Sequence, residues 1–251
     1  MNGRSLLASI NQTEVGTLRE VGGLWSFQYA EAWLSNPLGF ALSPHLPLVP
    51  EPLLDGASQR PVQWYFDNLL PEEGQRVLLA GDAKLDAADA FGLLAWYGAE
   101  SAGSVTLLPP DAEAQTVEPL RPLSDGALEA RIRQLPKAPL THAAIKRMSL
   151  AGAQHKLAVV LEEGALFEPA GATPSTHILK PDTANTQTPH LAVNEHFCMS
   201  LARRMKLLLH EIGDRGLART RKPGEPQHRR CMLLGLVVLF TADDQRLPEH
   251  E

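Results

Sequence analysis

Three strand-like runs separated by two turns open the chain, and this pattern constrains the fold more than any other feature of the sequence. The runs lie between residues 5 and 29, with Asn11-Gln12 at the first turn and Gly22-Gly23 at the second. Asparagine and glycine are favoured in tight turns between strands. The pattern predicts a mainly antiparallel sheet, and the helices that follow it make the expected fold class α+β.

Proline-rich and helical segments complete the first 110 residues. Four prolines between residues 43 and 52 exclude a helix interior there. Helical patterns are predicted at residues 31–34, at 62–80 with an interruption at Pro71, and at 87–97, and a short strand at 104–108. Residues 1–110 are therefore expected to form an N-terminal subdomain.

The next part of the chain is predicted as a linker, a helix and a second domain. Residues 111–118 are polar and show no periodicity, and Ser124 is a suitable N-cap for a helix that ends near residue 135. Residues 111–139 are therefore assigned to a linker and helix, and residues 140–207 to the second domain. The elements predicted in that domain are a hairpin at 157–161 and 165–168, a strand at 177–180 and a helix at 194–207.

Composition favours a soluble cytoplasmic protein. The net charge is −6, which gives no general electrostatic attraction to nucleic acid or anionic membranes. The two cysteines, Cys198 and Cys231, do not form a disulfide framework in a chain of 251 residues. The longest apolar run, residues 231–240, is too short to span a bilayer and is expected to be a buried strand or helix.

A loop of small residues precedes the strand at 157–161. Small side chains let backbone N–H groups approach a bound anion, as the phosphates of a nucleotide require. The loop matches neither the Walker pattern nor a G-x-G-x-x-G loop, so an ordinary tight loop is the alternative interpretation. The candidate binding residues are Ala151, Gly152, Ala153, Gln154, His155 and Lys156.

Lys180 ends an apolar strand 24 residues after Lys156. Kinases use a lysine at such a position to hold nucleotide phosphates, and a glutamate in the following helix to hold the lysine. Glu195 is the candidate partner in this chain. The alternative is a surface lysine at a strand end and a solvated glutamate.

The order of these motifs along the chain resembles the HipA family of bacterial toxin kinases. The resemblance covers roughly residues 5–207, and several ordered motifs are more specific than any one of them. Those motifs are residues 15–18, 27–29, 33–34, 46–48, 66–71, 103–109, 149–156, 173–180, 194–198 and 201–202.

The resemblance assigns roles to individual residues. It implies that residues 151–156 contact the phosphates of ATP and that Lys180 binds them. Ser149 corresponds to the serine that such kinases phosphorylate on themselves, which ejects the loop and switches the kinase off. His155 departs from the acidic residue common at that position. Mg²⁺ is the other cofactor that the resemblance implies.

The residues expected to perform phosphoryl transfer are not found in this sequence. The family's Asp-Gly-His-x-x-Asn stretch and later aspartate are absent, and Asp243-Asp244 has no neighbouring ligand. No catalytic residue and no metal ligand is therefore predicted. Residues 208–251 do not resemble the family, and we interpret them as an out-of-frame translation of a longer kinase gene.

Three functional interpretations remain open. The first is a serine/threonine kinase toxin of a toxin–antitoxin module that is catalytically incomplete in this chain. The second is a module that binds a HipB-like antitoxin without kinase activity, and the third is a non-functional remnant. The family implies a protein substrate of the aminoacyl-tRNA synthetase type, no membrane partner, and contact with DNA only through the antitoxin.

Overall fold

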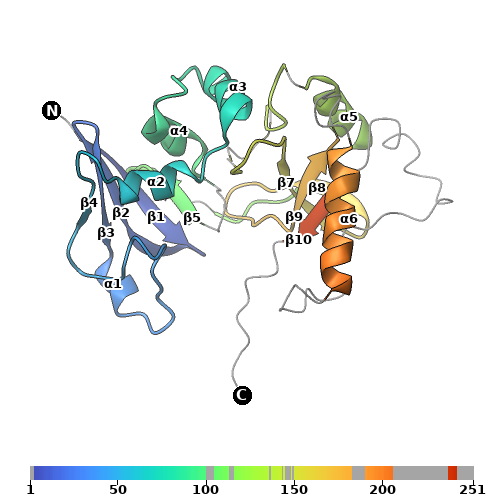
Figure 1. Ribbon diagram of the computed structural model, residues 1–251. Helices are drawn as coiled ribbons and strands as arrows, with labels where there is room; N and C mark the ends of the chain where they lie inside the picture. Colours follow the sequence, from blue (N-terminus) through green and yellow to red (C-terminus); the bar gives the residue numbers. More distant parts are fainter. Residues whose placement is uncertain are drawn as a thin grey trace. The chain divides into compact units, whose positions relative to one another are not determined.

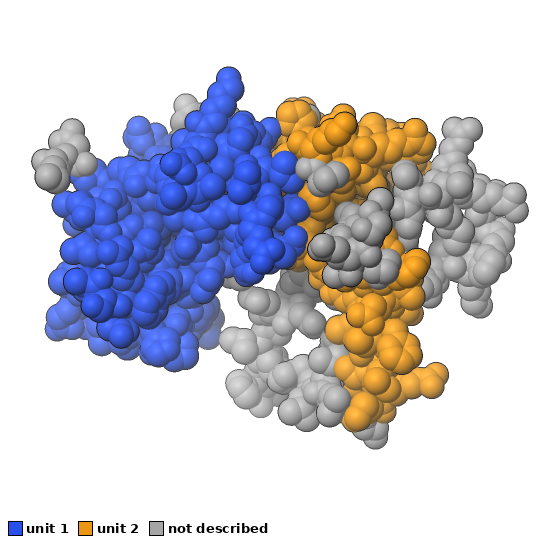
Figure 2. Space-filling model, turned by 45° about the horizontal axis from the view of Figure 1, so that its top comes forward, with its two compact units in different colours: residues 1–114, 146–153 blue, residues 115–145, 154–251 orange. Residues whose placement is uncertain are grey.

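The chain divides into two compact units (Figure 2). Unit 1 comprises Met1–Ala114 and Lys146–Ala153, and unit 2 comprises Gln115–Ile145 and Gln154–Glu251. Both contain helices and an antiparallel sheet, so the predicted α+β class is confirmed (Figure 1). The computed structural model describes residues 3–99, 105–112, 116–135, 137–142, 144, 148, 150–182, 190–205 and 237–241.

Unit 1 is built on a sheet whose strands are β1 (Arg4–Ile10), β2 (Thr13–Val21), β3 (Leu24–Tyr29), β4 (Leu53–Leu54) and β5 (Val105–Leu108). Their order is β4-β3-β2-β1-β5, and all pairs are antiparallel. The two predicted turns join β1 to β2 and β2 to β3. Asn11, Gln12, Gly22 and Gly23 all have positive φ, which two-residue hairpin turns of type I′ require.

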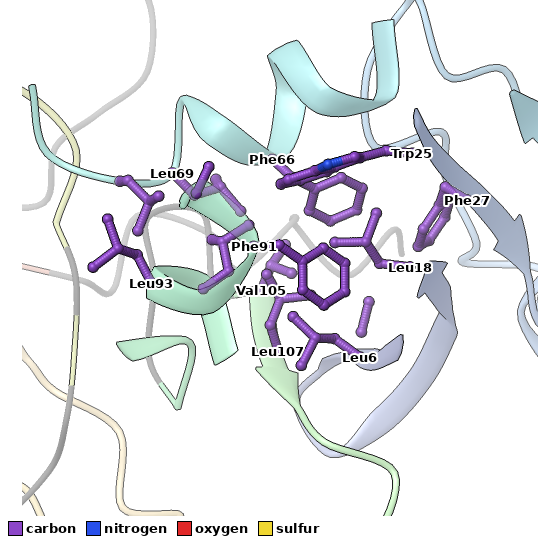
Figure 3. Packing of buried hydrophobic residues seen from close by; sticks show 14 of the residues in the cluster. Leu6, Leu18, Trp25, Phe27, Phe66, Leu69, Phe91, Leu93, Val105 and Leu107 are labelled. Carbon is purple, nitrogen blue, oxygen red and sulfur yellow. The ribbon is translucent and has the colours of Figure 1, made fainter. Parts of the chain in front are cut away.

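The apolar core of unit 1 lies between this sheet and its helices (Figure 3). The helices are α1 (Glu31–Leu34), α2 (Pro61–Asp67), α3 (Glu73–Ala83) and α4 (Ala90–Tyr97). Alternate residues of β3 face inward, and their rings meet those of the helices. The ring centroids of Trp25 and Phe91 lie 5.2 Å apart, as do those of Phe27 and Phe66. This packing joins β3 to α2 and α4.

Two polar groups hold the proline-rich segment and α2 on this core. Asp55, which is buried, accepts hydrogen bonds from the backbone N–H groups of Val62 and Gln63 at 2.9 and 3.1 Å. It thereby caps α2, whose own N-cap residue supplies no side-chain bond. The hydroxyl of Tyr29 donates to the carbonyl of Leu46 at 2.7 Å and accepts from the N–H of Leu42 at 2.9 Å.

Unit 2 has a second antiparallel sheet, in the order β10-β9-β7-β8-β6. Its strands are β6 (Arg121–Pro122), β7 (Leu157–Glu162), β8 (Ala165–Glu168), β9 (His177–Pro181) and β10 (Val237–Thr241), and its helices are α5 (Asp125–Arg133) and α6 (Leu191–Arg204). Ser124 caps α5 as predicted, because its hydroxyl accepts from the N–H of Ala127. α6 begins three residues before the predicted helix start at residue 194.

Part of the predicted linker is fixed to unit 2. Val117 forms a bridge with Gly171, and the N–H of Ala172 donates to the carbonyl of Thr116 at 2.8 Å. Gly171 has a φ of 52°, and a Cβ atom there would lie 2.2 Å from the oxygen of Thr116. Residues 116–118 are therefore held in place by contacts with unit 2, although the polar character of residues 111–118 predicts a linker.

Of the predicted out-of-frame tail, the structure describes residues 237–241. They form β10, which pairs with β9 and overlaps the apolar run predicted as a strand or helix. The remainder of the tail, including Asp243-Asp244, lies outside the described residues. Among the helices that the structure describes, none is long and apolar enough to cross a membrane.

Candidate nucleotide-binding site

The amine of Lys180, in β9, meets a carboxylate of α6. Its Nζ lies 2.5 Å from Oε1 of Glu195. The two side chains expose only 18% and 26% of their surface. Solvent and salt screen a shielded pair less than an exposed one, so this contact holds the amine in a defined position.

The periods of the strand and the helix explain why these two side chains meet. Side chains alternate in β9, where Leu179 and Pro181 are buried and Lys180 points to the opposite side of the sheet. In α6, Ala192 is buried and lies three residues before Glu195, on the same side of the helix. The predicted partners are therefore brought together, while their role in binding a nucleotide stays a prediction.

The predicted phosphate loop, residues 151–156, is divided between the two units. Residues 151–153 belong to unit 1, where Gly152 forms a parallel bridge with Pro71. Gly152 has a φ of 97°, which a residue without a Cβ atom adopts readily. Residues 154–156 belong to unit 2 and lead directly into β7.

Lys156 and Lys180 each adjoin one member of the same strand pair. β7 and β9 are antiparallel, with Leu157 opposite Leu179. Lys156 directly precedes Leu157 in the chain, and Lys180 directly follows Leu179. Two lysines provide positive charge and hydrogen-bond donors for phosphate oxygens. The sequence predicted both lysines as binding residues, but the register of the strands that they adjoin is known only from the structure.

His155, in the predicted phosphate loop, adds no positive charge at neutral pH. Burial lowers the pKa of its imidazole below the ordinary value of 6.5. A neutral imidazole leaves the two lysines as the cationic groups that the predicted site contributes from unit 2.

Two family models match separate parts of the chain. The HipA N-terminal domain matches residues 6–108, and the HipA-like C-terminal domain matches residues 148–216. The chain belongs to the HipA family. The second match extends beyond residue 208, where the tail is predicted to begin.

Named relatives agree with this assignment. The protein Y4mE of Sinorhizobium fredii is 38% identical over 182 residues, which are 70% of this chain and 42% of that protein. The serine/threonine-protein kinase toxin HipA of Shewanella oneidensis is 28% identical over 181 residues, or 71% of this chain and 39% of the toxin. The matched part of the chain thus spans less than half the length of either relative.

A solved structure shows the same fold. It is the complex of HipA, HipB and operator DNA from the toxin–antitoxin system of Shewanella oneidensis. The match has a TM-score of 0.65 at 22% identity, and it covers 98% of this chain and 52% of the chain matched. At this level of identity the likeness describes the fold alone.

The HipA family implies two cofactors, ATP and Mg²⁺. Lys156 and Lys180 suit the phosphates of ATP. Within the described ranges, no three His, Cys, Asp or Glu side chains come together as possible metal ligands. Ser149, the predicted self-phosphorylation site, lies outside the described residues.

Proposed function

We propose that this HipA-family chain provides the ATP-binding part of a serine/threonine kinase toxin. The observation behind the proposal is the shielded ion pair between Lys180 and Glu195. Protein kinases use a strand lysine to hold nucleotide phosphates and a helix glutamate to hold that lysine. A protein whose similarity extends over 71% of this chain is itself named a serine/threonine-protein kinase toxin.

Each residue of the site has a separate task in this proposal. Lys180 donates to phosphate oxygens, and Glu195 restricts the positions that its amine can occupy. Lys156, which directly precedes β7, adds a second positive charge. The small residues of the predicted loop, among them Gly152 with its positive φ, leave backbone N–H groups accessible to an anion.

Ser149 is the proposed site of inhibition by self-phosphorylation. A phosphate group on this serine would add about −1.5 to −2 charges at pH 7. Such a group and the phosphates of ATP repel each other, which is the physical reason for the inhibition in this proposal.

The residues of this chain bind the nucleotide but do not complete the transfer. Bound ATP supplies the phosphoryl group, while a catalytic aspartate and metal ligands are needed to move it. The sequence has no Asp-Gly-His-x-x-Asn stretch to supply them. The proposed substrate is a cytoplasmic protein of the aminoacyl-tRNA synthetase type, as in the family.

ATP binding to the full chain tests the proposal. Saturation-transfer NMR of ATP should give a weak but measurable affinity, and Lys180→Ala should reduce it about ten-fold, as expected for a lost charge-assisted hydrogen bond. Lys137→Ala removes an exposed lysine of the same unit and should leave the affinity unchanged. Equal affinities of the wild type and Lys180→Ala would contradict the proposal.

A second candidate function is binding of a HipB-like antitoxin, with DNA reached only through that partner. It is favoured by the fold match to a complex that contains HipB and operator DNA, and unit 1 has an apolar core of its own around which it can fold. Co-purification with the antitoxin encoded beside the gene would support it. Because unit 1 does not contain Lys180, Lys180→Ala should not affect that co-purification.

A further inference from the structure

Asp182 ties the start of α6 to the end of β9. The backbone N–H of Leu191, the first residue of α6, donates to Oδ1 of Asp182 at 3.2 Å. The first N–H groups of a helix have no partner within it, and a carboxylate also interacts favourably with that end of the helix dipole. The bond therefore fixes where α6 begins relative to the strand.

The Asp182 bond runs beside the contact between Lys180 and Glu195. On the strand side the two attachment points are two residues apart, which corresponds to about 6.6 Å. On the helix side, Leu191 and Glu195 are four residues apart, a rise of about 6 Å. The nearly equal spacings let both contacts form together, with α6 antiparallel to β9.

Pro181 makes the strand side of this arrangement stiff. It is buried and lies between Lys180 and Asp182. Proline fixes its own φ and restricts the preceding residue to extended conformations. The relative positions of the lysine and the aspartate are therefore set by the backbone, and a helix that binds Asp182 arrives with Glu195 opposite the lysine.

We infer that Asp182 is a positioning residue of the nucleotide site, which acts on Lys180 through the placement of α6 and Glu195. Its importance for ATP binding rests on the proposed function. A residue that merely caps the helix would contribute to stability independently of Glu195. A positioning residue loses its effect on Lys180 once the Glu195 carboxylate is removed.

The reactivity of Lys180 in the full-length chain tests this directly, without nucleotide. Acetylation by a small acylating reagent, followed by mass spectrometry of the peptide that contains Lys180, reports how firmly the amine is held. Glu195→Gln should speed labelling about ten-fold, as expected for a lost charge-assisted bond. Asp182→Ala should speed it about five-fold, corresponding to the loss of a helix cap.

Three further variants separate positioning from stability. Asp182→Asn keeps an acceptor oxygen and should restore labelling to nearly the wild-type rate. Glu162→Ala removes an exposed carboxylate of the same sheet and should change nothing. The double variant Asp182→Ala with Glu195→Gln should label no faster than Glu195→Gln alone.

Two results would overturn the inference. One is a wild-type labelling rate in Asp182→Ala, and the other is a double variant in which the two effects multiply. ATP affinities of the same variants distinguish this failure from failure of the proposed function. If labelling follows the expected order but Lys180→Ala binds ATP as well as wild type, the proposed function is wrong and the positioning role stands.

Discussion

The two units differ in what fills and stabilises their interiors. Unit 1 packs aromatic rings from strands and helices against one another. Within the described residues of unit 2, the buried core cluster is smaller and aliphatic, and shielded ion pairs join its elements. An apolar side chain can pack against many different neighbours. A charge that is shielded from solvent needs one particular partner of opposite charge. The unit that holds Lys180 and Glu195 thus combines a smaller apolar core with paired charges.

The largest effect is expected from opening the core of unit 1. Phe27 is fully buried, and Phe27→Ala should lower the free energy of unfolding by about 4 kcal/mol. Tryptophan fluorescence in urea measures this unit selectively, because all four tryptophans of the chain lie in it.

Phe40→Ala is the matched control for that substitution. Phe40 is 51% exposed and packs against Trp33, so its removal should cost about 1 kcal/mol. Similar losses for the two variants would show that unit 1 does not depend on its buried rings in the way its packing indicates.

A slightly smaller loss is expected when the ion pair between α5 and β8 is broken. Two nitrogens of Arg131 donate to the carboxylate of Glu168 at 2.6 and 3.1 Å, and the side chains are 15% and 10% exposed. Arg131→Ala leaves Glu168 buried without this partner and should cost about 3 kcal/mol. Amide hydrogen exchange in β7 and β8 measures the loss.

The same helix offers a control. Arg133 pairs with Glu129 at the surface, where 67% of the arginine side chain is exposed, and Arg133→Ala should cost no more than about 0.5 kcal/mol. If both arginine variants were equally mild, shielded charges would not explain the stability of unit 2.

Substitutions of Asp55 test how much a buried polar contact contributes to the stability of unit 1, whose core contains many aromatic rings. Asp55→Ala removes the acceptor of two N–H groups of α2 and should cost about 2 kcal/mol. Asp55→Asn keeps one acceptor oxygen and should cost roughly half as much. Tryptophan fluorescence in urea again gives the measurement, and a loss larger than that of Phe27→Ala would reverse the proposed difference between the units.

Local signals in the sequence predicted most of the fold. Gly22-Gly23 and Ser124 act on neighbouring residues, so the turn and the cap were placed correctly. The start of α6 was missed because part of its signal, Asp182, lies nine residues away in the sequence. The tie between Val117 and Gly171 was missed for the same reason.

Prediction of the candidate site from the sequence was limited in the same way. The pairing of Lys180 with Glu195 followed from a pattern that spans one strand and the next helix. The pairing of β7 with β9 and the pairing of Arg131 with Glu168 depend on which strands and helices become neighbours. Spacing along the chain does not encode that information.

The effects of pH on stability should appear at high pH for unit 1 and at low pH for unit 2. In unit 1, burial together with the neighbouring Tyr29 raises the pKa of Tyr65 from 10.0 to about 12. The folded state therefore keeps a proton that the unfolded state loses, and unit 1 should lose stability as pH rises from about 10 to 12. Tyr65→Phe removes this titrating group and should reduce the loss in the urea midpoint, while Tyr29, whose pKa burial also raises, should keep part of it.

In unit 2, burial lowers the pKa of His155 below its ordinary value of 6.5. The unfolded state then binds a proton more readily than the folded state, so the stability present above pH 6.5 declines as pH falls below it. His155→Gln should flatten this decline in urea titrations followed by the backbone NMR signals of β7 and β9. The tryptophan signal of unit 1 should not change with this variant between pH 5 and 7, because the titrating imidazole belongs to unit 2. A shift of the tryptophan signal would mean that the two units unfold together, and the contrast between their interiors would then not appear as separate stabilities.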